Sequence, residues 1–279
     1  PLMFADSGNA SIFYETAGDG EPVVMIAGFG ATHHYWSKAP ACLPGYRIIT
    51  MDNRGVGRTV YDGEFDTSDQ ADDVIAVMDA AGVGKAHIVG WSMGSVIARN
   101  LACRYPERVE DLVLVGTFVD IPLRSEYILN KITSMTVLGE IPLKCFYVMI
   151  NSFCFSEETF RRFSDEGHEP PIPREFQDPA GLMYQLKAID VKDRCTDDRD
   201  IRAPTLIVHG AEDIMVPPSE GRKMTRLIEG SELVLLEGQA HSIPLKAYSD
   251  RLLGFFRKHP VSRRRLSDGR PRFSRICPS

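Results

Sequence analysis

Three residues of this chain can form a proton relay for nucleophilic catalysis. Ser92 comes first, inside Gly-Trp-Ser-Met-Gly, Asp213 follows, and His241 comes last. A serine hydroxyl is a poor nucleophile at neutral pH, so it needs a base to take its proton and an acid to orient that base. The sequence therefore predicts acyl transfer with Ser92 as nucleophile, His241 as general base and then general acid, and Asp213 as the carboxylate that orients the imidazolium.

The serine has a recognisable local context. The β-branched run at 86–89 predicts a buried strand, and apolar residues at helical spacing over 95–105 predict a helix. A sharp turn between them forces the serine into unfavourable backbone angles, and side chains at Gly90 and Gly94 would collide. The strain pushes the hydroxyl clear of the backbone, beside the free N–H groups of the helix start. The alternative interpretation is a tight glycine turn with an idle serine.

The acid and the base each follow a predicted strand. Residues 205–210 indicate a buried strand with Asp213 in the loop after it, and residues 233–236 indicate the next strand, followed by His241. This order of serine, acid and histidine is the one expected for such a serine turn. The adjacent carboxylates Glu212 and Glu237 are each expected to face solvent or cap a turn, and Glu212 is the alternative acid.

The remaining histidines are expected to have supporting or surface positions. His87 lies within a predicted strand and is expected to pack in the core. His209 ends a strand and is expected to support the acid loop through a hydrogen bond. The others are two expected surface residues, His168 and His259, and two candidates for lining the pocket, His33 and His34.

Further glycine motifs complete a family pattern. Apolar residues 23–26 lead into Ala-Gly-Phe-Gly, and residues 51–58 read Met-Asp-Asn-Arg-Gly-Val-Gly-Arg. The second motif resembles the D-x-R-G-x-G-x-S segment of α/β-hydrolases, with Thr59 in the serine position. With the serine turn, the segment 210–217 and the Gly-x-x-His turn, the chain resembles small α/β-hydrolases of the esterase and lactonase type over roughly residues 10–256.

The resemblance implies an oxyanion hole and a substrate pocket. The backbone N–H groups of Phe29 and Met93 would donate to the developing oxyanion, and removing one such donor typically costs about two to three powers of ten in rate. The chain departs from the family at Ala27, where a loop-bracing histidine is usual, and this puts the rigidity of the loop in question, not the chemistry. The expected substrate-binding residues are Gly28, Trp91, Phe146 and Met149.

The order of the predicted elements favours an α/β fold. Strands that alternate with helices indicate a mostly parallel central sheet with helices on both faces, and residues 67–69 are expected to cap one of these helices. The strand series stops after 112–115, and the residues that follow are rich in aromatic residues and methionine. The resemblance implies that they form a helical cap over the active site. The expected units are the hydrolase core in 1–117 and 201–260, the cap in 118–200, and a basic, disordered tail in 261–279.

Composition narrows the class of protein. A chain of 279 residues with 43% hydrophobic content suits one α/β domain with an insertion. No run approaches the roughly 20 apolar residues of a membrane helix, and the start has no export signal, which favours a cytoplasmic protein. Six scattered cysteines favour reduced thiols over a metal site, and a net charge of −6 argues against a nucleic-acid partner, although the tail carries six arginines. No metal or organic cofactor is implied, and the oligomeric state is not fixed.

A serine nucleophile excludes the branches of this family that use an aspartate as nucleophile. The expected reaction is therefore hydrolysis of an ester or a lactone. The chain looks closest to 3-oxoadipate enol-lactonase-like enzymes and to esterases that open acyl-homoserine lactones. N-acyl-homoserine lactone is the preferred specific substrate, with an enol-lactonase or a general carboxylesterase as alternatives. Hydrolysis of a carbon–carbon bond and a cofactor-free perhydrolase remain open. The alternative of another class is a ligand-binding, receptor-like protein on a hydrolase scaffold, which a turnover assay separates from an enzyme.

Overall fold

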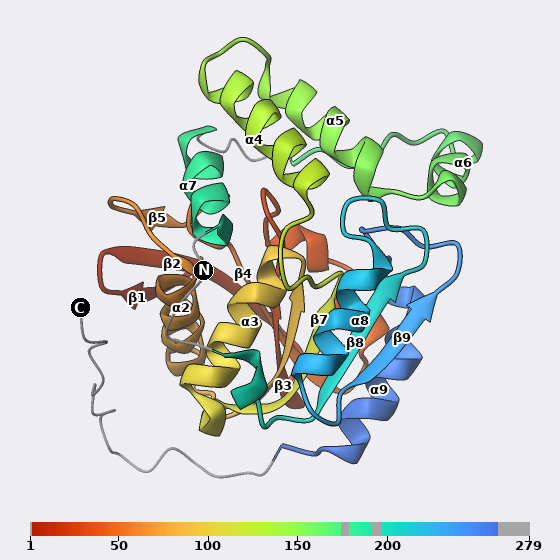
Figure 1. The fold of residues 1–279 in the computed structure, drawn as a ribbon. Helices are drawn as coiled ribbons and strands as arrows, with labels where there is room; N and C mark the ends of the chain where they lie inside the picture. Colours follow the sequence, from red (N-terminus) through yellow and green to blue (C-terminus); the bar gives the residue numbers. More distant parts are fainter. Residues whose placement is uncertain (1, 174–178, 191–196, 262–279) are drawn as a thin grey trace.

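A mostly parallel sheet forms the centre of the molecule (Figure 1). The computed structural model describes residues 2–173, 179–190 and 197–261. Within them the strands lie in the order β1-β2-β4-β3-β6-β7-β8-β9, with β5 beside β2. The strands from β3 to β9 in this order pair in parallel with their neighbours, and β2 pairs antiparallel with β1, β4 and β5. The strands are β1 (Met3–Ser7), β2 (Ala10–Ala17), β3 (Glu21–Ile26), β4 (Tyr46–Met51), β5 (Val60–Tyr61), β6 (Ala86–Trp91), β7 (Val109–Val115), β8 (Thr205–Gly210) and β9 (Glu232–Leu236).

Helices cover both faces of the sheet. Helices α2, α3 and α8 pack on one face, and α1 and α9 pack on the other. Helices α4 to α7 come between β7 and β8 and are called the helical insert below. The predicted α/β architecture with an inserted helical segment is thereby confirmed. The α-helices are α1 (Ala39–Cys42), α2 (Thr67–Ala80), α3 (Met93–Arg104), α4 (Leu123–Val137), α5 (Leu143–Cys154), α6 (Glu157–Asp165), α7 (Pro179–Asp190), α8 (Pro218–Leu227) and α9 (Ser249–Lys258), and the 3₁₀ helices are η1 (His33–Trp36), η2 (Pro106–Arg108), η3 (Asp198–Asp200) and η4 (Leu245–Ala247).

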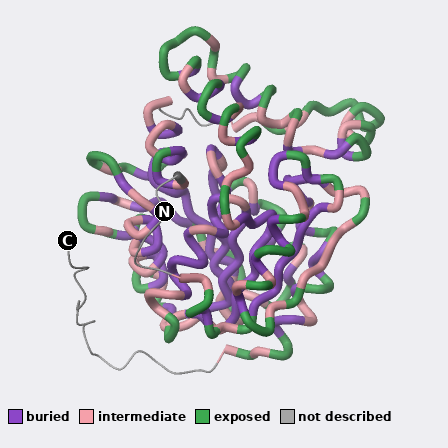
Figure 2. Tube along the Cα trace, viewed as in Figure 1, coloured by how far each residue is buried: buried purple, intermediate pink, exposed green. Residues whose placement is uncertain are grey.

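The central strands are apolar on both sides because both faces are covered. In β3, Val24 and Ile26 belong to the core under α2 and α3, whereas Val23 and Met25 belong to the core under α1 and α9. Successive side chains of a strand point to opposite faces, so a continuous apolar run fills both cores. Figure 2 shows the result as a buried centre with an exposed rim.

The N-cap of helix α2 lies one residue before the segment 67–69 that the sequence predicted as the cap. The N-cap is Asp66, whose carboxylate accepts hydrogen bonds from the backbone N–H groups of Ser68 and Asp69. The Asp69 carboxylate in turn accepts from the Asp66 N–H at 3.0 Å. This reciprocal pair satisfies donors at the helix start, and it replaces the predicted cap at 67–69.

The helical insert stands over the carboxyl ends of the parallel strands (Figure 1). Helices α4 and α7 pack against each other, and α4 also contacts α5. We propose that residues 118–200 act as the cap predicted from the sequence, between core segments 1–117 and 201–260. Residues 262–279 of the predicted tail lie outside the described residues. None of the described helices is long and apolar enough to cross a membrane.

Candidate active site

Ser92 occupies the sharp turn between β6 and α3. Its backbone angles are φ 53° and ψ −120°, and among the described residues it is the one non-glycine residue with a positive φ. A side chain at such angles is strained, and strain of this kind persists only where the surrounding structure imposes it. The predicted strand-to-helix turn is therefore present, and the strain is what lifts the Ser92 hydroxyl off the backbone.

The two glycines around Ser92 allow close backbone contacts. A Cβ added to Gly90 would lie 2.2 Å from the carbonyl oxygen of Gly94, inside the turn itself. A Cβ added to Gly94 would lie 2.2 Å from the carbonyl oxygen of Ile26, at the end of β3. Both distances are far below van der Waals contact, so the turn and its packing against β3 require glycine at both positions, as the sequence predicted.

The structure brings the three predicted relay residues together. His241 Nε2 lies 2.8 Å from Ser92 Oγ, and His241 Nδ1 lies 2.7 Å from Asp213 Oδ2. The histidine is 3% exposed, and the Asp213 carboxylate is fully buried. All three residues follow the carboxyl ends of parallel strands, because β6, β8 and β9 run in the same direction. The arrangement can pass the serine proton to the imidazole while the carboxylate holds the opposite nitrogen.

The Asp213 carboxylate is held by its own loop. Its Oδ1 accepts a hydrogen bond of 2.7 Å from the Val216 N–H, which leaves Oδ2 for His241. The nearby His209 donates through Nε2 to the Val216 carbonyl at 2.8 Å and lies 3.5 Å from Asp213 Oδ2. Burial lowers the pKa of His209, so its imidazole is held in the neutral form. The predicted support of the acid loop by His209 is confirmed.

The histidine loop is held by Trp91 and packs closely on Gly116. The Trp91 indole N–H donates to the His241 carbonyl oxygen at 2.9 Å, and the indole ring stacks on Tyr35 at 3.9 Å between ring centroids. The His241 imidazole also lies close to Gly116, where an added Cβ would be 3.1 Å from the ring. Gly116 was not among the residues predicted for the site, although a glycine directly after a strand is a signal for a close approach.

The predicted oxyanion loop lies beside the serine. A Cβ added to Gly28 would lie 3.0 Å from the Ser92 Cβ, and the start of α3 packs directly on the end of β3. The segments that carry the Phe29 and Met93 N–H groups therefore meet at the serine. The Met93 N–H is the first of α3, and the first N–H groups of a helix have no partner within it.

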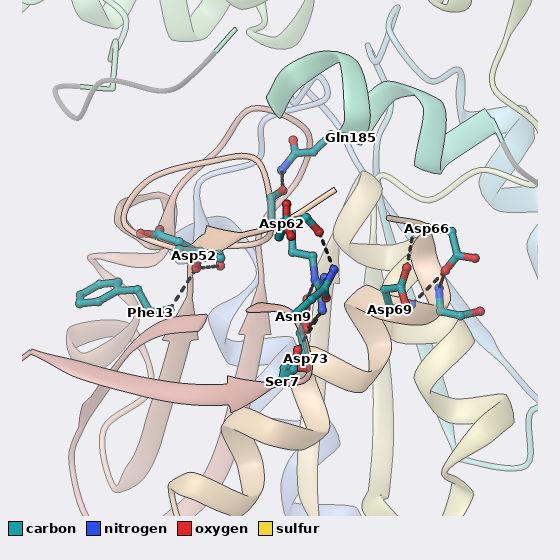
Figure 3. A network of polar contacts seen from close by, with 12 residues as sticks. Ser7, Asn9, Phe13, Asp52, Asp62, Asp66, Asp69, Asp73 and Gln185 are labelled. Atoms are coloured by element: carbon teal, nitrogen blue, oxygen red, sulfur yellow. Dashed lines mark hydrogen bonds and ion pairs between the residues drawn. The ribbon is translucent and has the colours of Figure 1, made fainter. Parts of the chain in front are cut away.

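The segment 51–58 is hydrogen-bonded to η1, which follows this loop. Asp52 is fully buried, and its Oδ1 accepts a 2.8 Å hydrogen bond from the His33 N–H and lies 2.8 Å from the ring Nδ1 of the same residue. The Arg54 guanidinium forms a buried ion pair with Asp73 at 2.7 Å, linking this segment to α2 (Figure 3). His33 is thus bound to a carboxylate in the interior. The Thr59 hydroxyl, in the serine position of the family motif, donates to the Asp52 carbonyl at 2.6 Å.

The other candidates occupy different environments. Phe146 is buried and its ring meets Phe29 edge to face at 5.9 Å, whereas Met149 is 41% exposed. Glu212 and Glu237 are both exposed. Contact of Phe146, Met149, Trp91 and Gly28 with a substrate stays a prediction. His87 is fully buried within β6, 2.9 Å from the Asp111 carboxylate, in the core position predicted for it.

No group of three or more histidine, cysteine, aspartate or glutamate side chains that could hold a metal ion occurs in the part of the chain that the structure describes.

Comparison with known proteins identifies relatives of this chain. The model of a family described as the alpha/beta hydrolase fold matches residues 21–139. A protein of Burkholderia cepacia named 2-hydroxy-6-oxo-6-phenylhexa-2,4-dienoate hydrolase is 30% identical over 244 residues, which cover 81% of this chain and 82% of that protein. A protein of Azorhizobium caulinodans, provisionally named carbamate hydrolase RutD, is 26% identical over 264 residues, covering 91% of this chain and 98% of that protein.

A solved structure shares the whole architecture. The crystal structure of the enol-lactonase from Burkholderia xenovorans LB400 matches with a TM-score of 0.76 and 20% identity, covering 92% of this chain and 97% of that chain. At this identity the likeness shows the fold, and the 30% identical relative shows the family. The chain belongs to the α/β-hydrolase fold family.

Proposed function

We propose that this chain is a serine hydrolase that cleaves carboxylic esters or lactones through an acyl-enzyme. The observation that carries the proposal is the continuous contact from Ser92 Oγ to His241 Nε2 at 2.8 Å and from His241 Nδ1 to Asp213 at 2.7 Å. A tight glycine turn with an idle serine would not require a strained backbone at Ser92 or a hydrogen bond from Ser92 to a buried imidazole. The strained φ of 53° at Ser92 adds independent support.

The chemistry follows from the positions of these groups. Ser92 Oγ attacks the carbonyl carbon while His241 Nε2 takes its proton, and the carbonyl oxygen becomes an oxyanion. The N–H groups of Met93 and Phe29 donate to that oxygen. Collapse breaks the C–O bond, His241 returns the proton to the leaving alcohol, and water deprotonated by His241 then releases the acid. A lactone follows the same course, except that its alcohol stays tethered to the acyl group.

The finer substrate preference is a separate question. N-acyl-homoserine lactone was the specific substrate favoured from the sequence, but no relative reported above carries that name. The enol-lactonase likeness concerns the fold. We therefore place esters and lactones together as the proposed class, and we treat acyl-homoserine lactones as one test group within it.

A second candidate is hydrolysis of a carbon–carbon bond. It is favoured by the 30% identity to the Burkholderia cepacia dienoate hydrolase. Such a reaction would use the same Ser92 and His241, with a carbon in place of the leaving oxygen that must receive the proton. A shared relay can thus serve either reaction, and substrate assays divide them.

The test is a hydrolysis panel run on wild-type protein and on Ser92→Ala. The panel contains p-nitrophenyl esters of increasing chain length, acyl-homoserine lactones of matching acyl chains, an enol-lactone, and 2-hydroxy-6-oxo-6-phenylhexa-2,4-dienoate. Acid release by wild type that is abolished in Ser92→Ala is the expected result. Activity on the dienoate alone would favour the second candidate. Tight ligand binding without turnover of any substrate would refute the proposal of a hydrolase and favour a binding protein.

A further inference from the structure

The oxyanion loop is contacted by the helical insert at its backbone. Gly30 follows Phe29, and its N–H donates to the Gln185 side-chain oxygen of α7 at 2.9 Å. The Gly30 carbonyl accepts a 2.8 Å hydrogen bond from the Tyr147 hydroxyl of α5. Both backbone polar groups of one loop residue are therefore held by side chains of the insert, which are 155 and 117 positions away.

Gln185 is itself fixed at both ends of its amide. Its oxygen accepts from Gly30, and its Nε2 donates to the Arg54 carbonyl at 2.7 Å. Figure 3 shows Gln185 reaching down from α7 toward the segment after β4. The side chain is fully buried. An amide has one acceptor end and one donor end, so this pair of partners allows a single orientation, and Gln185 bridges two loops of the core.

The approach of α7 to the core is unusually close at one point. A Cβ added to Gly55 would lie 2.6 Å from the Gly181 carbonyl oxygen, and one added to Gly181 would lie 2.3 Å from the Gly55 carbonyl oxygen. Backbone meets backbone here because neither residue has a side chain. This contact sets the distance between α7 and the core, and it thereby places the Gln185 side chain within hydrogen-bond distance of Gly30 and Arg54.

The α5 contact is also built into the interior. Tyr147 is 7% exposed, and burial raises the pKa of its phenol above the usual value, so the hydroxyl stays a donor. The neighbouring Phe146 packs edge to face on the Phe29 ring at 5.9 Å. The insert thus contacts the Phe29 side chain and both backbone polar groups of Gly30.

We propose that Gln185 and Tyr147 are positioning residues that set the oxyanion loop, so that the helical insert completes the oxyanion hole. The inference rests on the proposed function, because it assigns the oxyanion to the Phe29 N–H. The Gly30 N–H belongs to the Phe29–Gly30 peptide unit, which directly follows the Gly28–Phe29 unit that carries the Phe29 N–H. Clamping both polar groups of Gly30 therefore restricts how the Phe29 N–H can turn. A donor misplaced by a fraction of an ångström still binds substrate but stabilises the transition state less.

The test compares Gln185→Leu and Tyr147→Phe with Lys187→Met. Lys187 lies on the same helix and joins it to the core through an exposed ion pair with Glu64 at 2.9 Å, without touching the oxyanion loop. We expect Gln185→Leu to lower kcat about tenfold to a hundredfold with KM within about threefold, a fraction of the loss for removing a donor outright. Tyr147→Phe should lower kcat less, and Lys187→Met should leave both constants unchanged.

Gln185→Glu adds a signature that a purely structural role lacks. A protonated glutamic acid can accept from Gly30 and donate to the Arg54 carbonyl as glutamine does, whereas the carboxylate cannot donate. The ratio of its kcat to the wild-type kcat should therefore rise as pH is lowered. A ratio that does not change with pH, or a Gln185→Leu enzyme with kcat within twofold of wild type, would overturn the proposal, as would a rise in KM at unchanged kcat.

Amide exchange at Gly30 separates this inference from the proposed function. The Gly30 N–H should exchange with solvent at least about tenfold faster in Gln185→Leu than in wild type, and Ser92→Ala should leave its exchange unchanged. If wild type shows no turnover on any substrate but the exchange difference appears, the proposed function fails and the contact stands. If turnover depends on Ser92 but the exchange of the Gly30 N–H and kcat are the same in Gln185→Leu as in wild type, the inference alone fails.

Discussion

Replacing Asp213 by asparagine tests the relay through the proton on His241. The Val216 N–H donates to Oδ1 at 2.7 Å, and His241 Nδ1 faces Oδ2 at 2.7 Å. An asparagine must turn its oxygen to Val216, so its NH₂ group faces His241 Nδ1. The opposite orientation would set two donors face to face in a fully buried position. His241 Nδ1 must then accept, and the ring proton moves to Nε2, where it faces the Ser92 hydroxyl.

An imidazole protonated at Nε2 cannot take the serine proton. Inverting the tautomer in such a relay lowers kcat by about 10⁴, which corresponds to about 5.5 kcal/mol of transition-state stabilisation. Because the substitution keeps the size and shape of the side chain, substrate binding should change little. We therefore expect the loss in kcat and not in KM.

The assay is steady-state hydrolysis of the best p-nitrophenyl ester by wild type, Asp213→Asn and Glu212→Gln, with thermal unfolding as a check of folding. Glu212 is the matched control, because it is the adjacent carboxylate and it is exposed. Glu212→Gln should keep wild-type kcat. An Asp213→Asn enzyme within tenfold of wild type, or a large loss in Glu212→Gln, would refute the assignment of the acid.

Further predictions concern the turn, the histidine loop and pH. Gly94→Ala should destabilise the fold by about 2–3 kcal/mol in thermal unfolding, because its Cβ would meet a carbonyl oxygen at 2.2 Å, whereas Gly254→Ala, inside α9 with nothing within 4 Å, should stabilise by up to about 1 kcal/mol. Trp91→Phe removes the N–H that holds the histidine loop and should lower kcat about five- to tenfold in ester hydrolysis; Trp36→Phe, whose indole N–H finds no partner among the described residues, should not. Since burial lowers the pKa of His209 below its unfolded value of 6.5, the unfolded state binds more protons, and stability should fall as pH drops below about 6.5. His209→Gln should flatten this dependence in unfolding curves recorded between about pH 7 and pH 5, and an unchanged slope would contradict the attribution.

The sequence could predict the relay because each member belongs to a local pattern. Ser92, Asp213 and His241 each follow a short apolar run, and parallel strands bring such positions to one edge of the sheet. The glycines at 90 and 94 were predictable for the same reason, since the turn is made of neighbouring residues. The antiparallel place of β2 beside β4 was not, because strand order depends on contacts between distant segments.

The residues that hold the site in place could not be predicted from local pattern. Gln185 contacts Gly30 across 155 positions, and Trp91 contacts the His241 carbonyl across 150. The sequence predicts that Trp91 lines the pocket, and contact with a substrate stays a prediction, but its contacts with Tyr35 and the His241 carbonyl were not foreseen. The sequence around a buried glutamine or tryptophan does not indicate its hydrogen-bond partner, because the partner comes from a distant segment that only the fold brings close.

Covalent trapping tests whether Ser92 is the nucleophile. Wild-type protein, Ser92→Ala and Gln185→Leu are treated with a fluorophosphonate, and the product is measured by intact mass and mapped by peptide mass spectrometry. We expect one phosphonyl group per chain on Ser92, none on Ser92→Ala, and slower labelling of Gln185→Leu. Turnover of esters with no label on Ser92, or with the label on another residue, would contradict it.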